Sequence, residues 1–185
     1  IQRQLQIDEE VIHYLVGLYE SSEDVNRDEF RSFSDALLIR YPDIEALQWA
    51  PLVPSDGRDD YERSVTEQLG REIRITERDS EGTLVPAGER PVYFPIHFIE
   101  PLEIYSERIG FDLASNASNR EAMDSATAGK EPGVTRWLPE VNGEGDEYVI
   151  RVFAPVVEKP SEEDSPGAVD GFVVSTLRIA GVVEQ

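Results

Sequence analysis

The apolar run YFPIHFIEPL at residues 93–102 restricts the possible folds of this chain more than any other segment. Aromatic and aliphatic side chains fall on both faces of a strand formed by this run. One face would then pack on a core, and the other would face something apolar, such as a ligand-sized hollow. Pro95 interrupts the run, and because proline has no N–H to donate to a sheet ladder, it indicates an edge strand or a bulge. A binding site for a small molecule is therefore one hypothesis for this sheet.

The first twenty residues predict a long amphipathic helix that enters the domain from its N-terminal side. Apolar side chains recur at helical spacing, and acidic side chains occupy the other face. The apolar positions are Leu5, Val11, Ile12, Leu15, Leu18 and Tyr19. After a break at 21–26, Asn26 or Asp28 can cap a second helix, which Tyr41-Pro42 ends.

The rest of the chain carries alternating strand and helix signals. Strands are predicted at 44–53, 73–79, 93–102, 133–141, 147–159 and 171–183. Helices are predicted at 58–69 with a cap at Asp56 and a stop at Gly70, at 103–109 before Gly110, and at 119–129 with a cap at Ser118 or Asn119. The turn sequence at 142–146 pairs its flanking strands antiparallel. This order predicts an α+β domain built around an antiparallel sheet.

Composition excludes several kinds of chemistry. The 185 residues, of which 39% are hydrophobic, suffice for one well-buried domain. Cysteine is absent, which removes disulfides, thiolate catalysis and cysteine metal sites. The two histidines lack metal-ligand spacing, and no nucleophile elbow, phosphate loop or Ser/His/Asp order occurs. The sequence therefore predicts no catalytic residue, no metal and no cofactor.

The net charge of −21 argues against binding to nucleic acid or to anionic membrane surfaces. Two interpretations of the acidity stay open, namely a solvated surface suited to high salt and the capture of a cationic ligand. Charge runs usually form a solvated face, which favours the first.

No signal peptide or membrane span is recognised in the sequence. The apolar stretch at 168–183 is interrupted by Asp170, Ser175 and Arg178. Because the chain begins at Ile1, we expect it to be a piece of a longer protein.

Several aromatic side chains are candidates for lining a pocket. Trp49 and Trp137 lie in predicted strands, where each can line a pocket or simply fill the core. Strand alternation places Tyr93, Pro95 and His97 on one face. For His97, a core or rim position is favoured over a pH switch.

Polar candidates have structural alternatives as well. Asp112 follows Gly110-Phe111 at a loop-to-helix junction, so its carboxylate can accept hydrogen bonds from a ligand amine or cap the backbone. The cap is favoured. Arg58 and Glu62 lie one helical turn apart and are expected to pair at the surface.

A series of short blocks resembles the CHASE domain, the extracytoplasmic sensory domain of some histidine kinases and nucleotide cyclases. The blocks are EF-x-x-F at 29–33, ALQWAP-x-V at 46–53, Arg58 with Tyr61-Glu62, YFP at 93–95, EPL at 100–102, GFDL at 110–113, A-x-x-GK at 126–130, APV at 154–156 and GFV at 171–173. Each block alone is weak, and their shared order through most of the chain carries the resemblance.

The resemblance implies a PAS-like antiparallel five-stranded sheet with flanking helices, preceded by a long N-terminal stalk helix. On this basis residues 1–40 would form the stalk helix and a second helix. Residues 41–157 would form the membrane-distal, ligand-binding module. Residues 158–185 would be a loop and last strand leading toward a membrane-proximal module that is mostly absent.

The strand pattern and the resemblance together give a set of predicted ligand-binding residues. They are Trp49, Tyr93, Pro95, His97, Phe111, Asp112, Thr135, Trp137 and Phe153. In plant relatives, which bind adenine-type cytokinins, an Asp stands two residues before the tyrosine of the Tyr-x-Pro block. That position is Pro91 here, so the chain departs from the plant pattern.

The function implied is small-molecule sensing by a transmembrane receptor of the histidine kinase or diguanylate cyclase type. The domain would be periplasmic or extracellular, tethered by flanking membrane spans, and would dimerise through its N-terminal helix. Ligand binding would be transmitted through that helix, and nucleic acid is not an expected partner. The alternatives are a dimerisation or interaction module with a filled core and, less favoured, a carboxylate-dependent hydrolase.

Overall fold

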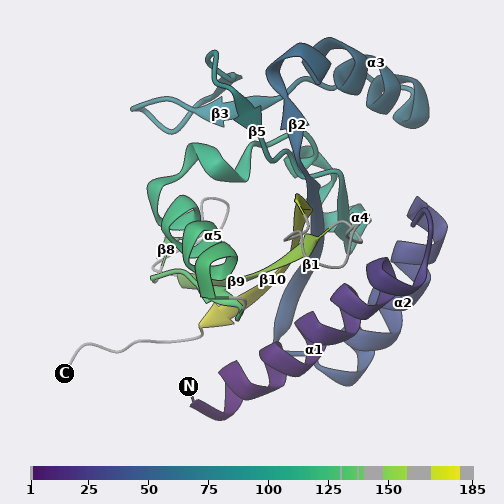
Figure 1. The fold of residues 1–185 in the computed structure, drawn as a ribbon, viewed down its shortest axis with the longest axis vertical. Helices are drawn as coiled ribbons and strands as arrows, with labels where there is room; N and C mark the ends of the chain where they lie inside the picture. Colours follow the sequence, from purple (N-terminus) through teal and green to yellow (C-terminus); the bar gives the residue numbers. More distant parts are fainter. Residues whose placement is uncertain (1, 130, 137, 140–147, 158–167, 180–185) are drawn as a thin grey trace.

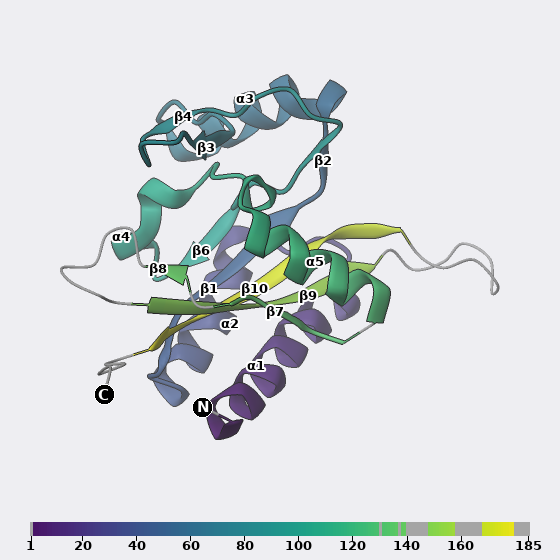
Figure 2. The ribbon, with the colours of Figure 1, turned by 90° about the vertical axis from the view of Figure 1, so that its left-hand side faces the viewer.

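The fold is an antiparallel sheet with helices on both faces, extended at one end by a small unit. The computed structural model describes residues 2–129, 131–136, 138–139, 148–157 and 168–179, and for residues 2–9, 139 and 179 it describes the backbone alone. Helices α1 (Gln2–Ser21) and α2 (Arg27–Arg40) lie on one face of the sheet, and α5 (Ala117–Gly129) lies on the other (Figures 1 and 2).

The main sheet has five positions, which confirms the predicted α+β architecture. Its strands are β1 (Ile44–Pro51), β6 (Phe98–Glu100), β7 (Gly133–Val134), β8 (Leu138–Pro139), β9 (Tyr148–Val157) and β10 (Val169–Ile179). The order across the sheet is β6-β1-β10-β9-β7, and every pairing is antiparallel. Strands β7 and β8 both pair with β9, as the antiparallel pairing of the late strands predicted.

Helix α1 lies on the sheet along the part whose side chains are described. Val11, Ile12 and Leu15 are completely buried and belong to the same apolar cluster as Leu47 of β1 and Val173 of β10. The apolar stripe predicted for this helix is therefore covered by the protein's own sheet over residues 11–15. This helix cannot present that part of the stripe to a second copy of the chain.

Helix α2 begins with a capping box. The Asn26 side chain accepts hydrogen bonds from the backbone N–H groups of Asp28 and Glu29, and the Glu29 carboxylate accepts one from the Asn26 N–H. These bonds satisfy orphan donors of the first turn. Of the two predicted caps, Asn26 is confirmed, and the helix ends before Tyr41 as expected.

The opposite face of the sheet is a packed core beneath α5. It contains Ile99 of β6, Phe153 of β9, Phe172 of β10 and Met123 of α5, which are all at least 95% buried. The cap of α5 is Asn116, whose side chain accepts from the N–H groups two and three residues later, so the predicted caps at Ser118 and Asn119 are wrong. The helix simply starts two residues earlier than the apolar periodicity indicates.

The run at 93–102 is two strands rather than one. Its first part belongs to β5 (Val92–Tyr93), which pairs with β2 (Val53–Pro54) in a small sheet, and its last part forms β6 at the edge of the main sheet. Between them, Pro95 makes an isolated bridge to Asp112. The break at Pro95 and the edge position were predicted correctly, whereas the continuous strand is wrong because the chain crosses here from one sheet to the other.

The small unit consists of β2, β5, α3 (Arg58–Leu69) and the hairpin β3 (Thr76–Arg78) and β4 (Leu84–Pro86). Figure 1 shows it at the end of the molecule away from α1. Helix α3 ends at Gly70 in a left-handed conformation (φ 65°), as predicted. Asp56 does not cap this helix, because it lies inside a 3₁₀ turn (Ser55–Gly57) that leads directly into α3.

The chain returns from β6 to the core through α4 (Leu102–Tyr105) and the 3₁₀ turn Ser106–Arg108. Gly110 follows with a φ of 91°, a backbone conformation that residues with a Cβ rarely adopt. Its position after the 3₁₀ turn agrees with the predicted end of the helix before Gly110. A further 3₁₀ turn, Leu113–Ser115, precedes α5.

The last described strand, β10, pairs with both β1 and β9 in the middle of the sheet. Residues 169–179, which follow the boundary predicted at residue 157, thus supply the middle strand of the sheet. The division of the chain into modules stays a prediction. A following membrane-proximal module remains a prediction. Within the described ranges, no helix has both the length and the apolar content that a membrane crossing requires.

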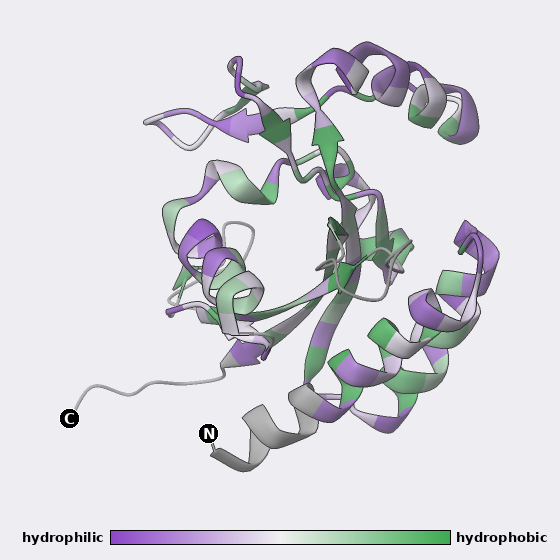
Figure 3. Ribbon diagram, in the orientation of Figure 1, coloured by the Kyte–Doolittle hydropathy of each residue, from purple (hydrophilic) through white to green (hydrophobic). Residues whose placement is uncertain are grey.

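Figure 3 shows how hydropathy is distributed over these elements. The strands of the main sheet are largely hydrophobic, whereas α3 and the hairpin β3–β4 carry many hydrophilic residues. The buried apolar side chains accordingly gather on the two faces of the main sheet, with a smaller cluster in the small unit.

The burial of α1 predicts a sharp difference between two neighbouring positions. Leu15→Ala removes a completely buried side chain and should lower the free energy of unfolding by about 2–5 kcal/mol. Tyr14 is 53% exposed, so Tyr14→Ala should change it by less than about 0.5 kcal/mol. Urea unfolding of both variants measures this. Equal effects would show that α1 does not pack on the sheet.

Candidate functional site

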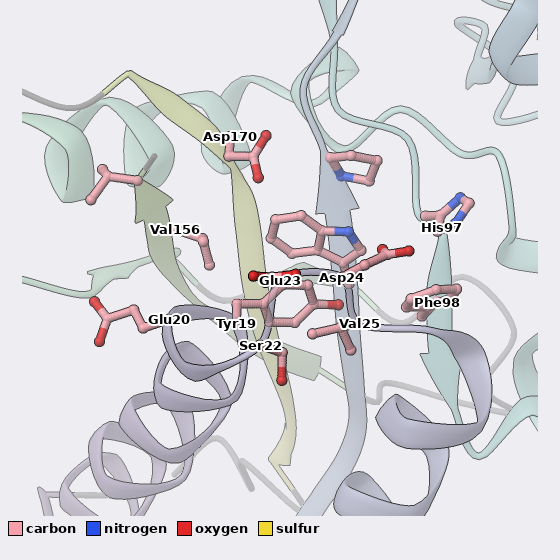
Figure 4. A pocket seen from close by; sticks show the side chains of 13 residues that line it. Tyr19, Glu20, Ser22, Glu23, Asp24, Val25, His97, Phe98, Val156 and Asp170 are labelled. Carbon is pink, nitrogen blue, oxygen red and sulfur yellow. The ribbon is translucent and has the colours of Figure 1, made fainter. Parts of the chain in front are cut away.

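A pocket of about 880 Å³ opens where the C-terminal end of α1 meets the sheet (Figure 4). Its walls come from the end of α1, the α1–α2 linker, β1, the start of β6, the end of β9 and the start of β10. The lining residues are Tyr19, Glu20, Ser22, Glu23, Asp24, Val25, Trp49, Pro51, His97, Phe98, Val156, Val157 and Asp170. Two of the predicted ligand residues, Trp49 and His97, are among them.

The floor of the pocket is aromatic. The rings of Tyr19 from α1 and Trp49 from β1 stack with their centroids 4.2 Å apart and an interplanar angle of 28°. Trp49 is only 6% exposed, whereas Tyr19 is partly exposed and lies at the centre of the pocket in Figure 4. This pair joins the helix directly to a central strand.

Gly171 of β10 makes room for the Trp49 ring. A Cβ at this position would lie 2.5 Å from the end of the Trp49 indole, 2.6 Å from the Ala50 carbonyl oxygen and 2.8 Å from the Pro51 Cα. Separations under 3.0 Å are essentially never seen for real Cβ atoms. The absence of a side chain at Gly171 therefore allows the Trp49 ring to lie against β10.

The rim of the pocket is acidic. Among the described residues that line it, Glu20, Glu23, Asp24 and Asp170 carry carboxylates, and none is a lysine or arginine. Asp170 reaches this face because the register of β10 against β9 shifts between Val169 and Gly171, which interrupts the side-chain alternation. Figure 4 shows Asp170 and Asp24 apart from each other and on separate elements, both above Tyr19 in this view.

The Tyr19 hydroxyl responds to this environment. Burial raises the pKa of Tyr19 well above its usual range, and the nearby Asp24 and Asp170 carboxylates raise it further. The hydroxyl oxygen is inaccessible to solvent and has no hydrogen-bond partner among the described residues. Two carboxylates from separate segments thus act on one aromatic group.

His97 contributes an uncharged imidazole. Burial lowers the pKa of His97 to about 4, and the positive charge of Arg27 contributes to that lowering. Its Nδ1 lies 3.3 Å from the Tyr61 hydroxyl, and its backbone oxygen accepts a hydrogen bond from Arg27 at 3.2 Å. The ring is therefore neutral at pH 7, and it adds no positive charge to the pocket.

Tyr93 lies away from this pocket, in the core of the small unit. It is 1% exposed, and its hydroxyl accepts from the Arg58 side chain at 3.3 Å and the Arg90 N–H at 3.2 Å while donating to the Gly88 oxygen at 3.1 Å. A second hollow, of about 910 Å³, borders these groups.

The charged groups around that second hollow bond to one another. Arg58 pairs with Glu62 at 2.9 Å, which confirms the predicted pairing, but both side chains are largely buried, so the predicted surface position is wrong. Arg58 also donates to the backbone oxygens of Ala87 and Ile75. Arg58 is thus largely occupied in joining α3 to the hairpin β3–β4. These contacts explain the position of the Arg58 side chain without a ligand.

Asp112 is a structural cap at the junction of the small unit and the core. It is completely buried, and one carboxylate oxygen accepts from the N–H groups of Phe94 and Ala114. The other accepts from Arg90 at 2.6 Å, and Arg90 also pairs with Glu77. The favoured structural interpretation of Asp112 is thus confirmed.

The remaining predicted residues belong to the core under α5 or to its margin. Phe153 is completely buried and packs edge-on against Phe172, and Phe111 packs against the same cluster. Pro95 is buried at its bridge to Asp112, and the Thr135 hydroxyl accepts from the Arg151 N–H at 2.9 Å. Trp137 lies outside the described residues. The predicted set is thus divided among separate regions.

Sequence reasoning missed the residues that α1, its linker and β10 contribute to the pocket. Tyr19 was identified only as part of an apolar stripe, and Asp170 only as a charge that interrupts an apolar stretch. The tyrosine at the end of that stripe, directly before an acidic break, was the signal that could have indicated it. In the part of the chain that the structure describes, no group of three or more His, Asp or Glu side chains is placed to hold a metal ion.

Comparison with known families identifies a match that covers most of the chain. The family model of the CHASE domain matches residues 23–185. The match begins in the α1–α2 linker, so it includes the strands that line the pocket and stops short of Tyr19 and Glu20. No curated protein matches the chain.

The close approach at Gly171 predicts that this position tolerates no side chain. Gly171→Ala should lower the free energy of unfolding by about 1–3 kcal/mol, because the new Cβ meets both the Trp49 ring and the backbone of β1. Gly17→Ala in α1 is the control, since a Cβ added there would have no neighbour within 4 Å and alanine favours helices. Urea unfolding would contradict the packing argument if both substitutions stabilised the protein.

The buried imidazole predicts a pH dependence of stability. Because the folded-state pKa of His97 lies near 4 and the ordinary value is 6.5, the unfolded chain takes up a proton first as the pH falls. The contribution of the neutral His97 ring to the free energy of unfolding is fully present above pH 6.5. It is lost as the pH falls from 6.5 to 4. From pH 7 to 5, wild type should lose about 2 kcal/mol relative to His97→Asn. Parallel curves of unfolding free energy against pH would refute the assignment.

Proposed function

Because the chain belongs to the CHASE domain family of extracytoplasmic sensor domains, we propose that it binds a small molecule in the pocket between α1 and the sheet. The observation that carries this proposal is the Tyr19–Trp49 stack, with ring centroids 4.2 Å apart. It places the end of the long N-terminal helix and a central strand in one pocket. A ligand there touches both the sheet and the element that would transmit its arrival.

The signal would be a shift of α1 against the sheet. A ligand changes a conformational equilibrium only as far as it binds one state better than the other. In this pocket, a guest that contacts Tyr19 on one side and β1 or β10 on the other favours one position of the helix end. The rest of α1 moves with it because a helix is a stiff element.

We further propose that the domain is the periplasmic or extracellular part of a membrane receptor of the histidine kinase or diguanylate cyclase type. The sheet with N-terminal helices on one face and α5 on the other supports a PAS-like description. Flanking membrane spans would tether it, and the domain itself would perform no catalysis.

A homodimer through α1 remains part of the proposal, with a changed contact surface. Val11, Ile12 and Leu15 face the sheet, so a second copy would contact the opposite side of the helix. Glu10, His13 and Tyr14 are exposed, and Tyr14 offers the largest apolar area among them.

The alternatives receive less support from the arrangement of side chains. The dimerisation or interaction module would have a filled core. The core under α5 agrees with that alternative, but the α1 face of the sheet has an aromatic pocket. For a hydrolase, the buried network of Asp112, Arg90 and Glu77 would be the candidate. Its carboxylate oxygens already accept backbone or arginine hydrogen bonds that hold the small unit to the core.

A thermal-shift screen of small metabolites tests the pocket. A compound present at a hundredfold its Kd should raise Tm of the wild-type domain by about 5–10 °C. The shift should vanish in Tyr19→Leu, because the ring that forms the pocket floor is removed. Tyr14→Leu is the matched control on the same helix, and it should keep the full shift.

The outcome against the proposal is equally specific. If stabilising compounds shift the Tm of Tyr19→Leu as much as that of wild type, the ligand lies elsewhere. The core under α5 or the second hollow near Arg58 would then be the place to look.

A further inference from the structure

We propose that the pocket at the end of α1 selects a small organic cation, such as a quaternary ammonium compound or a protonated amine. This inference deepens the proposed function, since it names the ligand class of the same site. It rests on the aromatic floor and on the carboxylates around it.

The aromatic floor suits a cation that is only weakly hydrated. The negative face of an aromatic ring attracts ammonium groups within about 6 Å of its centre. Tyr19 and Trp49 both line the pocket and stack with their centroids 4.2 Å apart, so each ring covers one face of the other. Tyr19 is the more exposed of the two rings and is the one that a cation would contact. The pocket volume of about 880 Å³ is that of a small-molecule site.

The carboxylates supply the opposite charge from separate segments. Glu20 lies in the last turn of α1, Glu23 and Asp24 lie in the linker, and Asp170 lies at the start of β10. None of the four makes an ion pair within the described ranges. A bound cation would therefore gain their attraction without displacing a protein cation.

Arg27, which follows the linker in the chain, makes no ion pair with the four carboxylates among the described residues. Arg27 lies over the Phe98 ring at 4.9 Å, and its guanidinium donates to the backbone oxygen of His97 at 3.2 Å. It thus contacts two of the lining residues, His97 and Phe98, and it does not line the pocket itself. His97 itself is uncharged at pH 7.

Other ligand classes fit less well. Phosphates and carboxylic acids would meet four like charges, and the net charge of −21 would oppose their approach at long range. A metal ion needs several oxygen ligands at short distance, and the described residues hold no such cluster. A bulky organic cation binds against the faces of aromatic rings and does not need several oxygen ligands at short distance.

Isothermal titration with choline and with tetramethylammonium tests the inference at constant ionic strength. The neutral probe 3,3-dimethylbutan-1-ol has the shape of choline with carbon in place of nitrogen. At least one of the two cations should bind at millimolar concentration or below, and should quench or shift tryptophan fluorescence. The neutral probe should bind at least about tenfold more weakly.

Matched variants test which carboxylates are needed for binding of the cation. The double variant Asp24→Asn/Asp170→Asn should weaken binding of the cation by at least about tenfold. Glu67→Gln/Glu81→Gln removes two exposed carboxylates from the small unit and should leave the Kd unchanged. Tyr19→Phe keeps the ring and should keep binding, whereas Tyr19→Leu should lose it.

Three results would overturn the inference: neither cation binds at millimolar concentration, the neutral probe binds as tightly, or the Asp24/Asp170 variant binds as wild type does. These results are distinct from failure of the proposed function. A neutral metabolite that stabilises wild type but not Tyr19→Leu would keep the sensing pocket and exclude a cationic ligand. A cation that binds equally to Tyr19→Leu would exclude both.

Discussion

The packing of α1 on the sheet is the interaction on which the rest of the site depends. Val11, Ile12 and Leu15 are completely buried, and each such side chain contributes about 1.5–3 kcal/mol when removed from water. This burial fixes the helix axis over the sheet and brings Tyr19, one turn beyond Leu15, onto Trp49. Without it, the aromatic floor and the acidic linker would not share a pocket.

The two faces of the sheet differ because their side chains fill space differently. Under α5, Phe153 and Phe172 interlock edge-on with helix and loop side chains in a continuous core. On the α1 face, α1 ends before the pocket-lining parts of β1 and β10, and Gly171, which has no side chain, lets the Trp49 ring and the backbone of β1 approach closely. A pocket results where the helix stops and the strands continue.

The carboxylates of the chain fall into two groups by their surroundings. Most carboxylates are exposed and solvated, in agreement with the first interpretation of the net charge. The four at the pocket differ because they surround aromatic rings with no described basic side chain among them. Charge of one sign on a surface attracts ligands of the opposite sign and repels ligands of the same sign.

Local signals in the sequence determined the α+β class, the two N-terminal helices, the antiparallel pairing of the late strands, the break at Pro95 and the caps at Asn26 and Gly70. Each depends on neighbours in the chain, through side-chain spacing, proline's missing N–H or glycine's freedom at positive φ. Only the tertiary structure decided the site. Strand alternation cannot say which face is filled. Phe153 and Tyr93 lie in cores, whereas Tyr19 and Asp170 line the same pocket on the α1 face. That arrangement requires the helix to pack and the register of β10 to shift, and both depend on contacts distant in sequence.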